Sequence, residues 1–289
     1  MIPIADVVLY HGPGCSDGWA SAWLAHRYGG VPAENLIPVS YGQPPPDLTG
    51  QRVLIVDFSY KRSVMLDIVR QAASVVVLDH HESAEKELEG LAIECLKMGL
   101  KPPHIGFDMT HSGAMLMWRW LSYAPPPAIV TYVEDRDLWK WKLFESKAIN
   151  AAIRSYPIDL KVWDRLNAEI GDKGGFPRLV NEGKAILRYQ DEVVAQHVGH
   201  AVETTIAGHK VLAVNATVLF SEIAGELARG RPFGAAFFIR KDGKRVYSLR
   251  SDENGQNVSL IAAVFGGGGH MRSAGFETDQ EYHFADQKV

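Results

Sequence analysis

The chain has 289 residues, of which 46% are hydrophobic and 22% charged, and its formal net charge is −4. Such a composition is typical of a globular protein with room for two domains, and the charge argues against a broad basic surface for long duplex nucleic acid. No apolar run approaches the ~20 residues of a membrane span, and the first residues lack the features of a signal peptide. With only two cysteines, Cys15 and Cys95, the sequence predicts a cytoplasmic protein without a membrane partner.

The first half of the sequence alternates short apolar runs with segments of helical periodicity. The runs predict strands at residues 7–10, 36–39, 53–56 and 75–78, with a further candidate at 93–96. The periodic segments predict helices at residues 19–28, 61–73, 112–123 and 128–133. Strands that alternate with helices of ~10–15 residues indicate a parallel sheet with right-handed crossovers. We therefore expect an α/β domain over residues 1–145.

The second half changes character twice. Residues 146–204 are helical and connecting, with long helices expected at 160–170 and 179–201. These helices predict a linker between domains and leave a homodimer open. Residues 205–289 predict a smaller mixed α/β domain. Its expected strands are 204–206, 210–214, 235–239 and 245–250, and its expected helices are 220–229 and 258–265.

Metal-ligating side chains follow the ends of the predicted parallel strands. They are His11 with Asp17, then Asp57, then Asp79 with His80 and His81, and finally Asp135. In open α/β sheets, ligands bind outside the carboxyl ends of the strands. A mixture of carboxylates and imidazoles suits Mn²⁺, Mg²⁺ or Zn²⁺. One such residue alone is more often a helix cap or turn residue, but four places along one sheet point to a shared metal site.

A glycine run, Gly266–Gly269, precedes His270 in the C-terminal domain. Four residues without Cβ atoms let backbone N–H groups form a concave nest for an anion, although such a run is as often a flexible loop. Arg250 follows a predicted strand, where its planar guanidinium either binds a phosphate in bidentate fashion or is a solvated surface group. Arg272 is a further candidate for phosphate binding.

The order of these motifs resembles the DHH phosphoesterase superfamily with its DHH-associated C-terminal domain. The resemblance rests on His11, Asp17-Gly18, Asp57, Asp79-His80-His81, Asp135 and the segment Gly266–Gly275. It covers nearly the whole chain. Within the superfamily, the length and the C-terminal motif are most similar to the nanoRNase and cyclic-dinucleotide phosphodiesterase group.

The resemblance implies a set of metal ligands. One ion would be held by His11 and Asp57 with an acid of the first turn, and the other by Asp17, Asp57, His80 and Asp135, so that Asp57 bridges both. Mn²⁺ is the expected ion, with Mg²⁺ or Co²⁺ as alternatives. The sequence departs from the family pattern at Cys15, where an acid is usual. Cys15 would be a weak ligand, which leaves open whether one ion or two bind.

The resemblance also implies roles for residues that do not hold metal. His81 would contact the phosphate or donate a proton to the leaving oxygen, and Asp79 would orient the cluster. The residues that would bind the substrate are Arg250, Gly267, Gly268, Gly269, His270 and Arg272. Trp139 and Trp141, which follow Asp135, either stack on a base or pack at a domain junction.

The expected function is metal-dependent hydrolysis of phosphodiester bonds in short oligonucleotides, or in linear or cyclic di- and mononucleotides. Such an enzyme would be an oligoribonuclease or a nucleotide phosphodiesterase. A bound metal ion can lower the pKa of water from ~15.7 toward ~7 and so supply a nucleophile against an anionic diester. Two alternatives stay open. One is a phosphatase or pyrophosphatase for a small phosphorylated metabolite, and the other is a non-catalytic nucleotide-binding regulator, which Cys15 makes conceivable.

Overall fold

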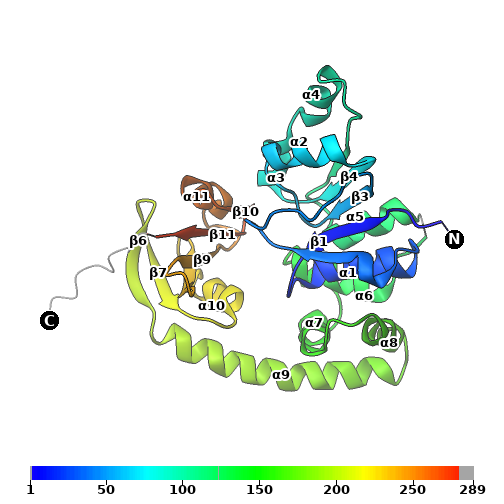
Figure 1. Cartoon of the computed structure of the whole chain (residues 1–289). Coiled ribbons are helices and arrows are strands. Elements are labelled where there is room, and N and C mark those ends of the chain that lie inside the picture. The colour runs from blue at the N-terminus through cyan, green and yellow to red at the C-terminus, as the bar shows by residue number, and fades with distance from the viewer. Residues whose placement is uncertain (1, 123, 280–289) are drawn as a thin grey trace. The chain divides into compact units, whose positions relative to one another are not determined.

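The computed structural model describes residues 2–122 and 124–279. The chain divides into two compact units, Met1–Leu187 and Arg188–Val289, which Figure 1 traces from blue to red. Residues 280–289 of the predicted C-terminal domain lie outside the described residues. Within the described ranges, none of the helices has both the length and the apolar character that crossing a bilayer requires.

Within its described residues, the first unit has one sheet of five parallel strands in the order β2-β1-β3-β4-β5. The strands are β1 (Val7–His11), β2 (Leu36–Val39), β3 (Arg52–Val56), β4 (Ser74–Asp79) and β5 (His104–Phe107). The prediction of a parallel sheet is confirmed, and the four predicted apolar runs are its first four strands. The sequence analysis missed β5, a short edge strand that contains a histidine and a glycine.

Helices cover both faces of this sheet. The helices from the start of the chain to the second unit are α1 (Ser16–Arg27), the short 3₁₀ helix η1 (Ala33–Asn35), α2 (Arg62–Gln71), α3 (Glu82–Leu88), α4 (Leu91–Lys97), α5 (Gly113–Leu121), α6 (Ala128–Asp137), α7 (Ser146–Ser155), α8 (Leu160–Ile170) and α9 (Gly175–Val198), whose last residues belong to the second unit. Successive side chains of a strand point to opposite faces. Accordingly, Val8 packs in the core with α1, α5 and α6, whereas Val7 and Leu9 pack in the core with α2 and α4.

The segment 146–204, which the sequence predicts as a linker, contributes to the first of these cores. Ile149 of α7, Trp163 and Leu166 of α8, and Leu179 of α9 are all buried in it. The indole Nε1 of Trp23 in α1 donates a hydrogen bond to the carboxylate of Asp164 at 3.0 Å. Helices α7 and α8 and the first turns of α9 therefore form part of the packed first unit.

The prediction of a strand at residues 93–96 is wrong, because these residues lie in α4. Leu91 and Cys95, four positions apart, face the core, while Ile93 and Leu96 are 60% and 59% exposed. That spacing is the period of a helix buried on one side. A run as short as four apolar residues does not distinguish this helix from a strand.

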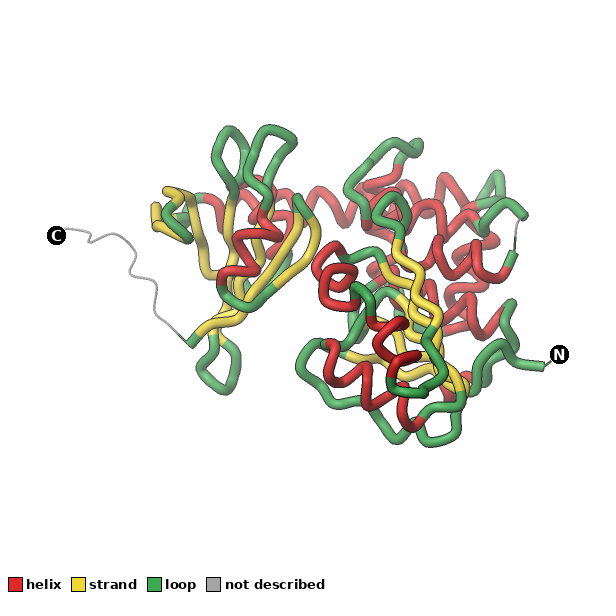
Figure 2. The backbone as a smooth tube through the Cα atoms, turned by 90° about the horizontal axis from the view of Figure 1, so that it is seen from above, coloured by secondary structure: helices red, strands yellow, loops and turns green. Residues whose placement is uncertain are grey.

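The second unit contains, in its described part, a mixed sheet of six strands in the order β10-β11-β9-β8-β7-β6. The strands are β6 (Val202–Ile206), β7 (His209–Asn215), β8 (Gly234–Ile239), β9 (Arg245–Arg250), β10 (Gly268–His270) and β11 (Ser273–Thr278). Only β7 and β8 pair in parallel among these. Helix α10 (Phe220–Leu227) packs in one core of this unit and α11 (Val258–Val264) in another. Figure 2 shows the strands of both units in yellow and the helices against them in red. The predicted mixed α/β domain is confirmed.

Candidate metal centre

The carboxyl ends of β1, β3 and β4 bring together most of the metal ligands that the sequence predicts. Three groups of residues each place one ligand atom per residue within 4.8 Å of the others: His11 with Cys15 and Asp57, Asp17 with His80 and Asp137, and Asp57 with Asp79 and His81. Parallel strands end at the same edge of a sheet, so residues far apart in sequence, such as His11 and Asp57, meet there. We call these residues the acid–histidine cluster.

Asp57 lies at the centre of the cluster, directly after β3. Its Oδ1 is 3.0 Å from Nε2 of His80, while its Oδ2 is 3.6 Å from Nδ1 of His11 and accepts a hydrogen bond from the thiol of Cys15 at 3.2 Å. Burial by itself raises the pKa of Asp57, but the hydrogen bonds from His11 and His80 outweigh it and hold that pKa well below its usual range. Asp57 therefore carries a negative charge shared between two sets of neighbours, as a bridging ligand requires.

The backbone of Asp57 is strained, since its φ of 56° lies in the left-handed region. A residue with a Cβ atom occupies this region at a cost of order 1–3 kcal/mol and does so mostly at functional sites. The conformation turns the chain sharply where β3 ends, and the carboxylate of Asp57 is thereby buried among the histidines. The strain is an independent sign that this position serves a function.

Asp17, in the first turn of α1, is held by the start of α5. Its Oδ2 accepts the backbone N–H of Gly113 at 2.6 Å, and its Oδ1 accepts that of Ala114 at 3.1 Å. A Cβ atom on Gly113 would lie 2.5 Å from the Cβ of Asp57, so only glycine fits between the two acids. Burial, with the charge of Asp57, raises the pKa of Asp17 well above its usual value. Asp17 is thus a preoriented acid whose Oδ2 lies 3.7 Å from Nε2 of His80.

Asp137, rather than Asp135, is the acid that α6 brings to the cluster. Its Oδ2 is 3.5 Å from Nε2 of His80. Asp135 is also close by in the chain and buried, but its carboxylate accepts the backbone N–H groups of Lys142 and Leu143, at 2.9 and 3.2 Å. Helical positions two apart do not face the same side. The predicted helix 128–133 stops short of both acids, whereas α6 continues to Asp137, and this extension decides which acid reaches the cluster.

The Asp79-His80-His81 segment begins with the last residue of β4. Asp79 is fully buried and accepts hydrogen bonds from the hydroxyl of Ser59 at 2.6 Å, from the N–H of His80 at 2.7 Å and from Nδ1 of His81 at 2.7 Å. Burial by itself raises the pKa of Asp79, but His81 and Ser59 bring it below its usual value. Asp79 therefore orients both histidines as a charged acceptor, which is the role that the resemblance implies for it.

His80 is the imidazole among the three acids Asp17, Asp57 and Asp137. Burial by itself lowers its pKa, but Asp57 above all, together with Asp137 and Asp17, raises that pKa to about 10. All three acids lie near the same nitrogen of His80, its Nε2. In a protein without bound metal, His80 therefore favours its protonated form, which the three acids share.

Cys15 is the position at which the sequence departs from the family pattern. Its sulfur caps α1 by accepting the N–H of Gly18 at 3.4 Å and donates to Asp57. Burial of the sulfur and the charge of Asp57 raise the pKa of Cys15 well above its usual value. Cys15 is therefore a neutral thiol in these surroundings, and a thiol is a far weaker metal ligand than a carboxylate for a hard ion.

The donor set fits a hard or borderline divalent cation. Three carboxylates surround His80, those of Asp17 and Asp57, which are buried, and that of Asp137, which is 22% exposed. Among the described residues, Oδ2 of Asp137 is a buried oxygen that accepts no hydrogen bond. A buried acid oxygen without a partner is costly unless it is neutralised or coordinates a cation. Oxygen and imidazole donors are those that Mn²⁺ and Mg²⁺ accept.

The predicted substrate-binding residues lie in the second unit. Arg250, at the end of β9, donates to the hydroxyls of Ser221 and Ser248. Arg272 donates to the backbone oxygens of Gly255 and Glu253, at 2.8 and 2.7 Å.

The glycine segment is more regular than the predicted nest or flexible loop, because Gly268–His270 form β10 and pair with β11. A Cβ atom on Gly267 would lie 2.1 Å from the oxygen of Gly275, and one on Gly269 would lie 2.5 Å from the oxygen of Ser273. Close strand packing therefore requires glycine at both positions, whether or not the segment binds a substrate.

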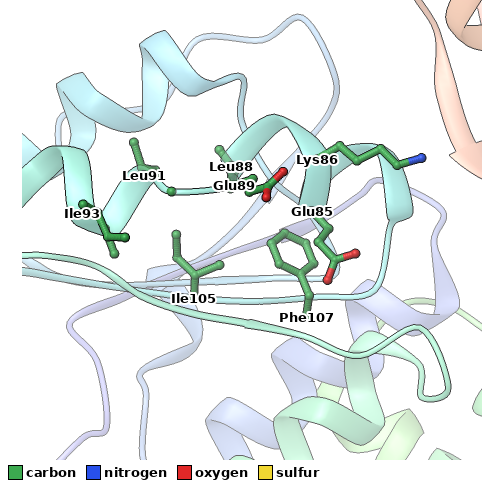
Figure 3. A pocket seen from close by; sticks show the side chains of 10 residues that line it. Glu85, Lys86, Leu88, Glu89, Leu91, Ile93, Ile105 and Phe107 are labelled. Atoms are coloured by element: carbon green, nitrogen blue, oxygen red, sulfur yellow. The ribbon is translucent and has the colours of Figure 1, made fainter.

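A pocket of about 510 Å³ lies elsewhere in the first unit, between α3, α4 and β5. Figure 3 shows the apolar side chains that line it, with the amino group of Lys86 pointing away. The lining includes Leu88, Leu91, Ile105 and Phe107. The pocket contains none of the residues of the acid–histidine cluster and is separate from it.

Sequence comparisons identify two distant curated relatives, and no protein-family model matches the chain. The uncharacterized protein R106 of Acanthamoeba polyphaga mimivirus is 28% identical over 93% of this chain and 66% of its own length. The oligoribonuclease NrnB of Bacillus subtilis (strain 168) is 24% identical over 75% of this chain and 56% of its own length. The chain thus spans 66% and 56% of the lengths of these relatives.

Solved structures share the fold across almost the whole chain. RecJ from Thermus thermophilus, solved in complex with Mn²⁺, has 16% sequence identity and a TM-score of 0.50, and the match covers 94% of this chain and 49% of RecJ. The DHH domain of a protein described as a member of a ribosomal protein family has 11% identity and a TM-score of 0.50, with 93% and 81% covered. These likenesses span both units of the chain.

The fold and the motif agree at the level of single residues. Four of the predicted ligands, His11, Asp17, Asp57 and His80, converge at the carboxyl edge of the sheet, and the DHH triplet Asp79-His80-His81 begins at the end of strand β4. The chain therefore shares the fold of these DHH-domain structures, and in fold and motif it resembles the DHH superfamily with its DHH-associated C-terminal domain.

Proposed function

We propose that the chain is a metal-dependent phosphodiesterase that acts on short oligonucleotides or on small linear or cyclic nucleotides. One observation carries the proposal, namely the convergence of His11, Asp17, Asp57, His80 and Asp137 in one cluster. The likeness to the oligoribonuclease NrnB supports a nucleotide substrate and membership of the nanoRNase-like group. With its two cysteines as free thiols, we expect the protein to act in the cytoplasm.

The five residues of this set would hold one or two divalent ions, with Asp57 shared between them. We propose Mn²⁺, which the structure of RecJ contains, with Mg²⁺ or Co²⁺ as substitutes. When bound, such ions lower the pKa of water and stabilise negative charge on phosphate oxygens. We infer that the site formed by Asp17, Asp57, His80 and Asp137 binds its ion more tightly than the site that contains Cys15, since a neutral thiol contributes little to a hard cation.

His81 is the proposed proton donor to the leaving oxygen. Asp79 accepts from its Nδ1 at 2.7 Å, so that ring nitrogen carries a proton and the ring orientation is fixed. To serve as the acid, the ring would have to carry a second proton on its other nitrogen, and the leaving oxygen would take that proton. Asp79 acts on the reaction through His81 and is a positioning residue.

In the second unit, we propose that Arg250, Arg272, His270 and the glycines 267–269 bind the nucleotide. The guanidinium groups of Arg250 and Arg272 are already oriented by hydrogen bonds to serine hydroxyls and to backbone oxygens. An oriented guanidinium loses little entropy on binding a phosphate. The homodimer left open by the sequence remains a hypothesis.

An activity panel tests this proposal. Purified protein should hydrolyse dinucleotides in the presence of Mn²⁺, and removal of the metal with a chelator should abolish the activity, which added Mn²⁺ should restore. Cyclic mononucleotides, cyclic dinucleotides and pyrophosphate complete the panel. Turnover of pyrophosphate without turnover of any diester would favour a pyrophosphatase. Nucleotide binding without turnover under Mn²⁺, Mg²⁺ and Co²⁺ would favour a regulatory protein.

A further inference from the structure

We propose that the loop of residues 138–145, which follows the last residue of α6, binds a base of the substrate, with the indole ring of Trp139 as the stacking surface. We call this segment the tryptophan loop. The inference rests on the proposed function and deepens it, because it adds a base-specific subsite to a site otherwise built for phosphate. It also predicts a preference for nucleotides over phosphorylated compounds without a base.

The backbone of the tryptophan loop is strained at three residues that are not glycine. Trp139, Trp141 and Glu145 have φ angles of 56°, 51° and 55°. Bulky side chains rarely occupy this region, because their Cβ atoms approach backbone oxygens too closely. Such strain persists where the surrounding structure enforces it and is concentrated at binding and active sites.

Core packing does not explain the ring of Trp139, which is 43% exposed. Its aromatic neighbour is Trp141, whose ring lies at 5.1 Å and 70°. Replacing an exposed tryptophan costs little folding free energy, so stability does not require this side chain at position 139. Trp139 nevertheless occupies a backbone conformation that favours glycine. The combination of strain with exposure indicates that the ring serves a ligand.

Asp135 is buried because it holds the backbone of the tryptophan loop in place. Its carboxylate accepts the N–H groups of Lys142 and Leu143, and its backbone oxygen accepts those of Lys140 and Trp141, at 2.8 and 3.2 Å. Four backbone donors of the loop are thus satisfied by one residue. Asp135 is a positioning residue for the tryptophan loop rather than a ligand of the metal.

The loop begins beside the acid–histidine cluster. Asp137, whose Oδ2 is 3.5 Å from His80, precedes Trp139 by two residues. The amino group of Lys140 donates to the backbone oxygen of Thr110 and to Glu134, which fixes the loop against the segment leading to α5. Because the loop follows directly on a residue of the cluster, we infer that it lies within reach of the base of a nucleotide whose phosphate is bound there.

The composition of the loop suits a single-stranded nucleotide. Aromatic and basic residues alternate in Trp139-Lys140-Trp141-Lys142, and Nζ of Lys147 lies 5.7 Å from the centre of the Trp141 ring. Stacking on an aromatic ring tolerates any base, since every base has a π face, and neighbouring lysines attract the phosphate backbone. Pyrophosphate has no base that could stack on the ring and no nucleotide backbone that could lie along the lysines.

The variant Trp139→Gly separates this role from a structural one, because glycine fits the φ angle and removes only the ring. We expect the KM for a dinucleotide to rise roughly 10-fold or more, as the loss of one stacked base implies. The kcat/KM for an abasic dinucleotide should stay within about twofold. The melting temperature of Trp139→Gly should be unchanged or slightly higher, because strain is relieved.

Trp120→Ala is the matched control. Trp120 lies near the end of α5, is 45% exposed and contacts His104 in an aromatic pair, so it equals Trp139 in exposure. We expect Trp120→Ala to leave the KM for the dinucleotide unchanged. An unchanged KM in Trp139→Gly would overturn the inference. So would equal losses for the normal and abasic dinucleotides together with a lower melting temperature, since that outcome indicates a structural role.

Calorimetry distinguishes a failure of this inference from a failure of the proposed function. The whole protein is titrated with adenosine 5′-monophosphate and, separately, with ribose 5-phosphate, and neither measurement requires turnover. Trp139→Gly should bind the former about 10-fold more weakly and the latter as the wild type does. A wild type that hydrolyses no diester would end the proposed function, yet this titration would still decide the inference. Equal affinities of both proteins for the monophosphate would refute it.

Discussion

Asp137→Asn is expected to abolish tight binding of Mn²⁺ and to lower kcat/KM for a dinucleotide by about 10³-fold or more. The variant keeps the shape of the side chain and removes one charged ligand. A metal ion supplies several kcal/mol of transition-state stabilisation, and about 4 kcal/mol corresponds to about 10³-fold in rate. Calorimetric titration with Mn²⁺ and steady-state kinetics measure the two effects.

In contrast to its losses in metal binding and activity, Asp137→Asn should not destabilise the metal-free protein. Burial, partly offset by His80, raises the pKa of Asp137 above its usual value. A carboxyl whose pKa is raised by folding destabilises the folded state as the pH rises through that pKa. Replacement by a neutral amide removes this cost, so the free energy of unfolding at neutral pH should stay unchanged or increase.

Asp135→Asn is the matched control, since it changes the same chemical group two residues away. An amide cannot accept both N–H groups that the carboxylate of Asp135 accepts, so we expect a loss of about 1–3 kcal/mol in the free energy of unfolding. Affinity for Mn²⁺ should change by less than about tenfold. If Asp135→Asn loses the metal while Asp137→Asn retains it, the assignment of the two acids is reversed.

Cys15→Asp is expected to act with opposite signs in the absence and presence of metal. Without metal, a new carboxylate would lie beside the oxygen of Asp57 that Cys15 now contacts at 3.2 Å. We expect the free energy of unfolding to fall by about 1–3 kcal/mol, because the added buried charge would lie against the charge of Asp57. With Mn²⁺ present, the additional charged ligand should raise metal affinity about tenfold or more and increase occupancy of the site that contains His11.

Cys15→Ser provides the control for this prediction, because a hydroxyl still caps α1 and adds no charge. Its metal affinity and stability should remain close to those of the wild type. Chemical denaturation with and without Mn²⁺, together with calorimetric stoichiometry, measures the effects. Unchanged affinity and unchanged stoichiometry in Cys15→Asp would contradict the view that Cys15 weakens one metal site.

The sequence predicted those parts of the centre that depend on local pattern. Runs such as Val75–Leu78 are apolar throughout because the strands are buried on both faces, and each strand ends where polar residues begin. Four predicted ligands, His11, Asp17, Asp57 and His80, could therefore be placed at one edge from the ends of the predicted parallel strands. Pairing between Asp79 and His81 is likewise local, since the two residues are two apart in sequence.

The parts that the sequence did not predict depend on tertiary contacts. The choice between Asp135 and Asp137 depends on how far α6 extends and on the loop whose N–H groups capture Asp135. Likewise, residues 93–96 belong to a helix because Leu91 and Cys95, on one side of α4, face the core, and the four-residue run alone does not show this. The spacing Asp135-Arg136-Asp137 was the available signal, because two acids in one helix face different directions and only one of them can join the cluster.

The most direct test is a crystal of the protein soaked in MnCl₂, with the anomalous signal of manganese measured. We predict a peak coordinated by the carboxylates of Asp17, Asp57 and Asp137 and by the imidazole of His80, with any second, weaker peak beside His11. An anomalous map in which these side chains point apart and no manganese lies between them would contradict the account.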